Sequence, residues 1–366
     1  MATVSGDWIK KLPLDSQIEI YENIVRKDYT QVELAKIQSE LKDEFSKHTE
    51  QGRRTDLEDG TSAKNFAEVK RVSDMVGGIF GESGRTVEKR VSVYKQAKEN
   101  PDDYGDLLER MEESVHSAHR ELKRRKDIAE REEKLKDAPE LKNLILGDCL
   151  EKIEEIPDDS IHLLLTDPPY GTNTVTGARF ETEKLREDWT YDGDDESVYP
   201  LLNRLFEKMK PKLVKDAHIY IFTSWKAWHR LYPIVDEFFE VKNWLVYLHY
   251  MATAGDLYRY RTAASSIMFA SNGGKRPIGS HKWNFIDERG TYRKDGMAHH
   301  PAQKSISICK KLIENSTVEG ETVLDPFCGS GSTLVAAEEL GRNWIGIEKE
   351  RRWYDVAKSR ILEARN

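Results

Sequence analysis

DPFCGSGSTLVAAEELGRNWIGIE, Asp325–Glu348, predicts a strand, a tight turn and a helix followed by a second strand. A short apolar run ends at Asp325, Gly329 and Gly331 form a small-residue turn, and the helical run leads to a strand ending at Glu348. Glycines let a backbone approach a ligand closely, and an acid about 20 residues beyond the turn offers two acceptors to a ribose diol. The stretch therefore predicts a nucleoside site, although such turns also occur as simple packing features.

A second motif, TDPPYG at Thr166–Gly171, follows the apolar run Ile161–Leu165. Two prolines remove two backbone donors and fix φ, so the strand cannot continue through them. The chain therefore displays the carboxylate of Asp167, a rigid carbonyl and the ring of Tyr170 where a strand ends. Open α/β sheets bind their ligands at this end of the strands.

These motifs, together with LILGDCLE at Leu144–Glu151 and HHPAQKS at His299–Ser305, resemble a known family. It comprises the amino-methyltransferases that act on exocyclic base nitrogens with S-adenosylmethionine. The catalytic motif precedes the cofactor motif, as in the beta group, whose fold is circularly permuted. The resemblance covers roughly residue 143 to the C-terminus. It implies an α/β fold of class I S-adenosylmethionine-dependent methyltransferases, with a Rossmann-like doubly wound sheet.

The resemblance also implies a role for individual residues, and it implies no metal. The catalytic residues would be Asp167, Pro168, Pro169 and Tyr170. The residues expected to bind S-adenosylmethionine are Asp148, His300, Lys304, Asp325, Phe327, Gly329, Gly331, Thr333 and Glu348. Asp148 has a local alternative as the cap of a helix that starts near Leu150. Ser305 replaces a proline common in the family, and we expect little effect from the change.

The implied reaction is methylation of an exocyclic amine, whose lone pair is delocalised into the base. Hydrogen bonds from the amine to Asp167 and to the Pro168 carbonyl would localise that lone pair, while Tyr170 stacks on the flipped-out base. Aspartate at the first motif position favours adenine N6 in this family. Three alternatives remain: a cytosine N4-methyltransferase, a helix-turn-helix regulator with an inactive or cofactor-sensing methyltransferase domain, and methylation of RNA or protein.

Residues 1–138 differ in character, being highly charged and helical in pattern, and predict a separate all-α domain. Tyr29-Thr30 is expected to start one helix. Residues 66–98 predict a helix-turn-helix, in which Ser83 caps a second helix with Val87, Val91 and Tyr94 on its inward side. A helical hairpin with a solvated face is the alternative.

The outward side of that second helix is predicted to face DNA. It would carry Arg85, Thr86, Lys89, Arg90 and Val93, a composition typical of a recognition helix. The run from Ser83 to Glu112 also resembles the helix-turn-helix region of ParB-type partition proteins, which implies DNA binding. The charged run 114–136 that follows is interpreted as a connector helix, because acidic residues accompany its basic ones.

The methyltransferase domain is predicted to span 139–366, with a target-recognition segment at about 252–298. The long polar stretch after DPPY predicts a lid, with Arg179 and Trp189 as DNA contacts. Arg259 and Arg261 alternate with tyrosines and are further candidates for DNA contact, although a packed strand edge is equally expected. Apolar runs at 219–222, 244–250 and 267–270 predict strands, and 199–209 a helix.

Composition limits the class of protein. The 366 residues carry a formal net charge of −8, which argues against nonspecific coating of nucleic acid but leaves room for a local basic surface. Three widely spaced cysteines predict neither a disulfide framework nor a zinc site, and all three are expected to be reduced and structural, with Cys328 in the glycine turn as the candidate for sensitivity to thiol reagents. No apolar signal segment or membrane span is evident, so we expect a cytoplasmic protein. The expected partner is double-stranded DNA, while a homodimer and a cognate restriction endonuclease stay open.

Overall fold

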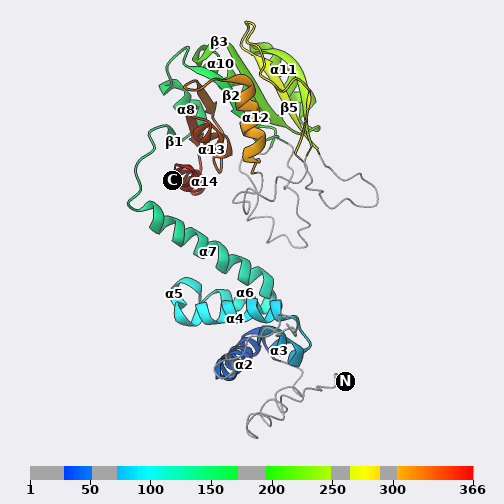
Figure 1. Cartoon of the computed structure of the whole chain (residues 1–366), viewed down its shortest axis with the longest axis vertical. Helices are drawn as coiled ribbons and strands as arrows, with labels where there is room; N and C mark the ends of the chain where they lie inside the picture. Colours follow the sequence, from blue (N-terminus) through cyan, green and yellow to red (C-terminus); the bar gives the residue numbers. More distant parts are fainter. Residues whose placement is uncertain (1–28, 52–71, 172–194, 249–263, 289–302, 366) are drawn as a thin grey trace, which may run out of the picture. The chain divides into compact units, whose positions relative to one another are not determined.

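The computed structural model describes residues 29–51, 72–171, 195–248, 264–288 and 303–365 (Figure 1). The chain divides into two compact units, Met1–Glu130 and Arg131–Asn366. This division falls within helix α7 (Val115–Leu135), before the boundary near residue 139 that the sequence predicts. Within the described ranges, no helix combines the length and the apolar character needed to cross a membrane.

The first unit is helical, as predicted. Its other described helices are α2 (Gln31–Gln51), α3 (Val72–Phe80), α4 (Gly84–Glu99), α5 (Pro101–Tyr104) and α6 (Leu107–Glu113). The predicted start at Thr30 is confirmed by a reciprocal cap. The Glu33 N–H donates to Thr30 Oγ1 at 3.2 Å, and the Thr30 N–H donates to Glu33 Oε2 at 3.1 Å.

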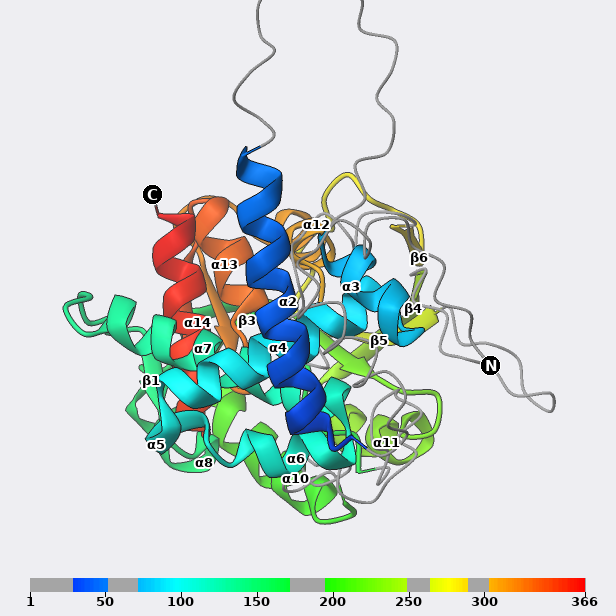
Figure 2. The same ribbon diagram turned by 90° about the horizontal axis from the view of Figure 1, so that it is seen from below.

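Two apolar clusters hold this unit together. In the first, Phe45 of α2 packs with Val76 and Ile79 of α3 and with Val87 and Val91 of α4. The second joins α2, α4, α6 and α7 through the side chains Ala35, Val93, Leu107, Met111, Ala118 and Leu122. Helix α2 crosses α4 in Figure 2, and α4 contributes to both clusters. Helix α4 is therefore the central element of the unit.

The second unit is built on one mixed sheet. Its strands are β1 (Leu144–Leu146), β2 (Ile161–Thr166), β3 (Leu213–Thr223), β4 (Glu240–Leu248), β5 (Ala264–Ser271), β6 (Phe285–Asp287), β7 (Thr322–Asp325) and β8 (Asn343–Glu348). They lie in the order β1-β8-β7-β2-β3-β5-β4-β6. The first five strands in this order are mutually parallel, whereas β5 runs antiparallel to both β3 and β4.

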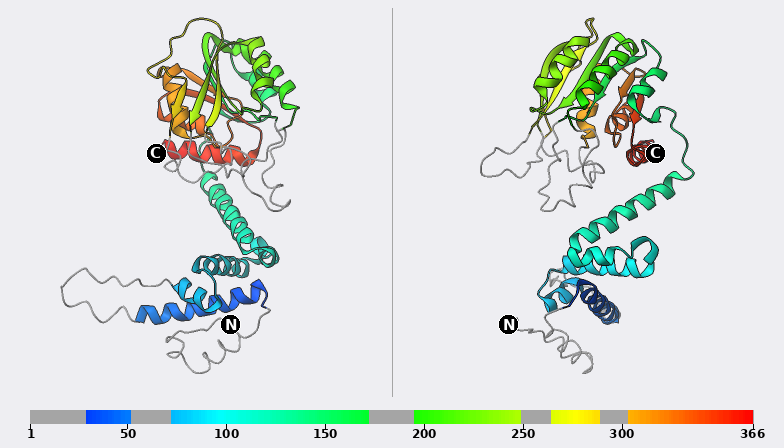
Figure 3. Two further views of the ribbon diagram at one scale, coloured as in Figure 1. Left: turned by 90° about the vertical axis from the view of Figure 1, so that its right-hand side faces the viewer. Right: turned by 180° about the vertical axis from the view of Figure 1, so that it is seen from behind.

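Helices cover both faces of this sheet, as Figure 3 shows. One face packs against α12 (Ile306–Ser316), α13 (Ser332–Glu339) and α14 (Arg351–Ala364). The other face packs against α8 (Cys149–Lys152), α10 (Val198–Met209), α11 (Trp228–Phe238) and the 3-10 turn η2 (Ile153–Glu155). A second 3-10 turn, η3 (Lys210–Lys212), leads from α10 into β3. The near-continuous apolar strands reflect burial on both faces.

The chain path confirms the predicted doubly wound, permuted sheet. From β7 the chain crosses through α13 to β8 on one side, and from β2 it crosses through α10 to β3 on the other. The direction of winding therefore reverses between β7 and β2, which is where such sheets bind ligands. The strand of the DPPY motif precedes the strand of the glycine motif in sequence, yet the two are neighbours in the sheet.

The predicted target-recognition segment, 252–298, is only partly within the described residues. Its described part includes β5, which lies inside the sheet between β3 and β4, and β6, which pairs with β4 at the edge. Part of this segment is therefore sheet structure. Residues 249–263 and 289–302 lie outside the described ranges.

Candidate active site at the switch point of the sheet

Four carboxylates follow four adjacent parallel strands at one edge of the sheet. Asp148 follows β1, Glu348 ends β8, Asp325 ends β7 and Asp167 follows β2. The carboxyl ends of parallel strands meet at the same edge, so residues far apart in sequence converge there. The structure thus brings the predicted acidic residues of both motifs to the switch point.

Asp325 links the two motifs. Its Oδ1 accepts a 2.9 Å hydrogen bond from Thr166 Oγ1 and a 3.2 Å hydrogen bond from the Phe327 N–H. Burial raises the pKa of Asp325 to about 7, although hydrogen bonds from Thr333 and Thr166 act in the opposite direction. Asp325, Phe327 and Thr333, all predicted as cofactor residues, are therefore joined by hydrogen bonds at the end of β7, where Asp325 and Thr333 are buried. Thr166 was not predicted, because nothing in the sequence shows that its hydroxyl faces β7.

The two glycines of the turn differ in the space around them, because Gly331 is tightly packed and Gly329 is not. Gly331, with φ +78°, begins α13, and a Cβ on it would lie 2.9 Å from that of Ala357. Gly329, with φ +51°, has no atom of the described residues within 4 Å of the place where a Cβ would lie. Glycine is needed at both for conformation, but the space over Gly329 is free for a ligand.

Glu348 is tied directly to this turn. Its Oε2 accepts a 2.8 Å hydrogen bond from the Gly329 N–H, and its Oε1 accepts one of 2.8 Å from the Glu350 N–H. Burial raises the pKa of Glu348, while those two backbone donors lower it. Each carboxylate oxygen has a second lone pair, so the group can still accept from a ribose diol. The open turn and this carboxylate fit the nucleoside part of S-adenosylmethionine.

A buried cation under the turn was missed by sequence reasoning. Arg360 of α14 donates through Nη1 to the Ser330 carbonyl at 2.5 Å, to Ser330 Oγ at 3.1 Å and to Ser332 Oγ at 3.2 Å. Arg360 therefore holds the glycine turn in place through its hydrogen bonds to Ser330 and Ser332. An arginine on a charged C-terminal helix is ordinarily a surface residue, and no sequence signal sets this one apart.

The DPPY motif places its carboxylate between two donors. Tyr170 donates its hydroxyl to Asp167 Oδ1 at 2.5 Å, and Lys304 forms an ion pair with Asp167 Oδ2. The Lys304 ammonium lies 5.2 Å from the centroid of the Phe222 ring, and the Tyr170 carbonyl accepts from Tyr199 Oη at 2.9 Å. Lys304, predicted from the HPxxK motif as a cofactor residue, thus contacts Asp167, the residue predicted to be catalytic. Pro168 is buried and Pro169 half-buried.

Two residues at the edge of the site have local structural functions. Asp148 caps α8 by accepting from the Leu150 N–H at 2.9 Å, which is the local alternative weighed for it; its cofactor contact stays a prediction. Serine in place of the family's proline at position 305 was expected to have little effect. Ser305 caps α12 by accepting from the Ser307 N–H at 3.1 Å, and it also donates to buried Glu288 at 3.3 Å. Ser305 therefore does contribute to the position of α12.

In the first unit, helices α3 and α4 lie on either side of a short turn, the arrangement that a helix-turn-helix requires, and one predicted contact needs correction. Ser83 caps α4 and accepts from the Thr86 N–H at 3.2 Å, while Val87 and Val91 face inward. Arg90 and Val93, however, are buried rather than outward-facing. Arg90 is paired with Glu82 and donates to Gln38 at 2.9 Å, so it is a structural cation. The prediction of Arg90 as a DNA contact is wrong, because α4 packs on two sides instead of one.

Several predicted contacts cannot be placed. Arg179, Trp189, Arg259, Arg261 and His300 lie outside the described residues, as does the predicted lid. In the described part of the chain, no group of His, Cys, Asp and Glu side chains is arranged to hold a metal ion.

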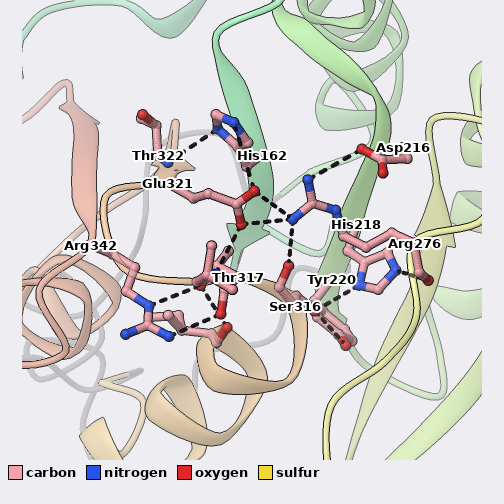
Figure 4. Close-up of polar contacts among 12 residues, drawn as sticks. His162, Asp216, His218, Tyr220, Arg276, Ser316, Thr317, Glu321, Thr322 and Arg342 are labelled. Atoms are coloured by element: carbon pink, nitrogen blue, oxygen red, sulfur yellow. Dashed lines mark hydrogen bonds and ion pairs between the residues drawn. The ribbon is translucent and has the colours of Figure 1, made fainter.

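A second polar group lies at the opposite, amino-terminal edge of the sheet (Figure 4). Arg276 donates to Glu321 at 2.7 and 2.9 Å and to Asp216 at 3.2 Å. His218 bonds Ser316 Oγ at 2.8 Å and the Arg276 carbonyl at 3.1 Å, and burial lowers its pKa. These bonds connect the starts of β3 and β7 with the end of α12 and form a structural clamp, although the buried Arg276 Nε has no hydrogen-bond partner among the described residues.

The three cysteines lie in the interior of the second unit. Cys149, Cys309 and Cys328 are all free and buried. Burial raises the pKa of Cys149 and of Cys309 to about 12, and it raises that of Cys328 well above its ordinary value. Free, buried thiols agree with the prediction that all three cysteines are reduced and structural, and the sensitivity of Cys328 to thiol reagents stays a question for experiment.

The chain is similar to several known proteins. The family described as DNA methylase matches residues 161–359. A putative methylase of Escherichia coli (strain K12), YubD, is 31% identical over 231 residues, covering 60% of this chain and 90% of the relative. The type II methyltransferase M.HinfI of Haemophilus influenzae is 27% identical over 250 residues, which cover 61% of this chain and 69% of that protein. The solved M1.HpyAVI–SAM complex has 22% identity and a TM-score of 0.47, covering 60% of this chain and 98% of that one.

Proposed function

This chain belongs to the DNA methylase family, and from that premise we propose that it is a site-specific DNA adenine N6-methyltransferase. It has the class I S-adenosylmethionine-dependent fold, and its cofactor is S-adenosylmethionine. The observation that carries the proposal is the convergence of Asp167 with the Gly329 turn, joined by the Thr166–Asp325 hydrogen bond of 2.9 Å. An acceptor for an amine thereby lies beside a nucleoside site.

The cofactor residues follow from the geometry of the turn. Glu348 would hold the ribose hydroxyls, while the open backbone at Gly329 would lie against the nucleoside. Asp148, at the end of the next strand, would contact the adenine end. When bound, S-adenosylmethionine supplies an activated methyl group; the protein supplies orientation and hydrogen bonds.

Asp167 would act on the target amine as a hydrogen-bond acceptor. A carboxylate has about four lone-pair sites, and Tyr170 and Lys304 engage two of them here. The remaining capacity lets Asp167 accept from the amine N–H, with the Pro168 carbonyl accepting the other hydrogen. These bonds localise the nitrogen lone pair and direct it to the methyl group. The target base must leave the duplex to reach this site, where the Tyr170 ring would stack on it.

The choice of adenine rests on aspartate at position 167, which is a tendency of the family. The experiment is methyl transfer from labelled S-adenosylmethionine to unmethylated genomic DNA, followed by nucleoside digestion and mass analysis. N6-methyladenosine in the digest is the expected result. N4-methylcytosine would replace the proposed base while retaining the reaction, and absence of transfer despite cofactor and DNA binding would overturn the enzyme assignment.

A further inference from the structure

A fifth carboxylate, Glu288, lies at the same edge of the sheet as the four acids of the site. It directly follows β6, which is parallel to β4 and therefore runs in the same direction as β2 and β3. None of the sequence motifs of the site includes this residue, and yet its side chain is only 1% exposed. A carboxylate is almost never fully buried unless it is paired, so the partners of Glu288 indicate its role.

Three partners of Glu288 belong to the beginning of α12. Ser307 donates its hydroxyl to Oε1 at 2.6 Å, Ser305 donates to Oε2 at 3.3 Å, and the Lys311 ammonium lies 3.1 Å from Oε1. Ser305 also accepts from the Ser307 N–H as the cap of the helix, so its hydroxyl connects the carboxylate to a backbone donor of the first turn. A negative charge near a helix N-terminus is favourable in addition. Glu288 therefore fixes the start of α12.

On its other side, Glu288 is tied to the sheet. Its N–H donates to the Leu248 carbonyl at 3.2 Å, and Tyr247 donates its hydroxyl to Oε2 at 3.5 Å. Both partners are the last residues of β4, and β4 pairs with β6 along the strand that ends just before Glu288. The carboxylate thus connects the β4–β6 edge of the sheet with α12.

The start of α12 determines where Lys304 lies. Lys304 immediately precedes the cap residue Ser305, and its ammonium is paired with Asp167 and lies 5.2 Å from the centroid of the Phe222 ring. The lysine side chain is long and flexible, so its ammonium keeps one position only if the backbone that carries it is held. That backbone is held next to Lys304 by the cap, and the cap is bonded to Glu288.

The cap is also a point at which this chain departs from its family. Proline is common at position 305, and a proline has no hydroxyl to donate to Glu288. Ser305 has a φ of −64°, which proline would adopt as well, so the backbone conformation does not require serine. What serine adds is the hydroxyl. Its hydrogen bond to Glu288 is therefore a feature that a chain with proline at this position could not form.

We propose that Glu288 is a positioning residue for the reaction: by holding the cap and the first turn of α12, it keeps Lys304 on Asp167. The inference rests on the proposed function, in which Asp167 accepts a hydrogen bond from the target amine. Lys304 engages one oxygen of that carboxylate and leaves lone pairs for the amine. A displaced Lys304 would alter the orientation of the acceptor and so lower the rate of transfer.

The test is a double-mutant cycle in the full chain. Glu288→Ala, Lys304→Ala and the double variant are compared by their turnover number per folded molecule at saturating S-adenosylmethionine and DNA. Glu288→Ala should lower the turnover number about ten-fold in the wild-type background and less than about two-fold in the Lys304→Ala background, because Glu288 acts through that lysine. Equal losses in both backgrounds, or no loss in the single variant, would overturn the proposal.

The matched control loosens the other end of the same helix. Arg276 donates to the Ser316 carbonyl in the last turn of α12 at 3.1 Å, and Arg276→Ala should leave the turnover number per folded molecule unchanged. A milder change at the cap keeps the test open if Glu288→Ala does not fold. Ser305→Ala should lower turnover about three-fold, and Ser305→Thr, which keeps the hydroxyl, should restore it. A loss in Arg276→Ala as large as that in Glu288→Ala, or a failure of threonine to restore turnover, would overturn the proposal.

The position of Lys304 can also be measured without methyl transfer. Its side chain is 17% exposed and ion-paired, so acetic anhydride in trace amount should acetylate it slowly. Peptide mass analysis should show a rate at Lys304, relative to exposed Lys98, that rises several-fold in Glu288→Ala and not in Arg276→Ala. An unchanged rate in Glu288→Ala would overturn the positioning role. If Lys304 responds as expected while no protein, wild type included, transfers methyl groups, only the proposed function fails.

Discussion

Thr166 donates its hydroxyl to the Asp325 carboxylate at 2.9 Å across 159 positions of sequence. The bond joins the last residue of β2 to the last residue of β7, and so connects the DPPY motif with the glycine turn. Both partners are buried, and Asp325 also accepts from the Phe327 N–H. The positions of the DPPY motif and of the glycine turn therefore depend on each other.

Replacing Thr166 tests this connection. Thr166→Val keeps the shape but removes the donor, so Asp325 loses one hydrogen bond in a buried place. The free energy of unfolding should fall by about 1–2 kcal/mol, and the KM for S-adenosylmethionine should rise. Urea titration and steady-state kinetics measure the two effects. Thr166→Ser, which retains the hydroxyl, is the control, and equal behaviour of the two variants would refute the role of the bond.

Asp325 makes stability depend on pH. Its pKa is raised to about 7 in the folded protein. Protonation of Asp325 therefore adds to the free energy of unfolding, completely at a pH below the pKa of the unfolded state, and this contribution is lost as the pH rises through 7. Between about pH 5.5 and about pH 8.5, wild-type stability should fall by on the order of 2 kcal/mol from this group. Asp325→Asn should remove that component. An identical pH profile for both proteins in urea titrations would contradict the assignment.

The catalytic carboxylate can be separated from cofactor binding. Asp167→Ala should retain the affinity for S-adenosylmethionine, measured by calorimetry, because Asp167 lies beyond the glycine turn. Its turnover number should fall by about a thousand-fold, because the variant lacks the carboxylate that would accept a hydrogen bond from the target amine in the transition state. Asp158→Ala, which removes an exposed carboxylate paired with Lys212, serves as the matched control. Near-normal turnover in Asp167→Ala would eliminate the proposed mechanism.

The clamp at the opposite edge of the sheet should affect stability alone. Arg276→Ala leaves Glu321 without its cation, and the free energy of unfolding should fall by about 2 kcal/mol. Arg351→Ala removes an exposed pair with Asp355 and should cost less than about 0.5 kcal/mol. Turnover per folded molecule should stay normal in both variants. Equal stability losses would show that the clamp contributes no more than a surface pair.

The thiols should be protected until the protein unfolds. Because burial raises the pKa of all three cysteines, a disulfide reagent such as DTNB should react slowly with the native protein at neutral pH. In urea it should titrate three thiols rapidly. Fast modification of a native thiol, accompanied by loss of methyl transfer, would show that Cys328 is accessible after all.

Much of the catalytic unit could be predicted from local sequence. The motifs around Asp167 and Gly329 each combine a strand end with residues that force a turn, and hydrophobic runs of strand length gave the positions of β2, β3, β5, β7 and β8. The Ser83 cap was likewise a local signal, since its side chain reaches only three residues ahead. In each case the deciding interactions lie within a few residues along the chain.

Contacts between distant segments could not be predicted in this way. Helical periodicity indicated a single buried face of α4, and Arg90 was therefore predicted to be exposed and to contact DNA. In the structure α4 packs on two sides, and Arg90 is paired with Glu82. Arg360 and Lys304 gave no sign that one supports the glycine turn and the other contacts Asp167. Their partners are defined only when α14 and α12 pack on the sheet.

The sequence by itself determined the order of the elements, the residue types at each strand end and the class of chemistry they serve. Strand ends, prolines and glycines act through local backbone geometry, which the sequence encodes directly. The tertiary structure alone decided which charges are paired and which thiols are buried. Pairing and burial depend on distances between side chains far apart in sequence, and only the packed fold sets those distances.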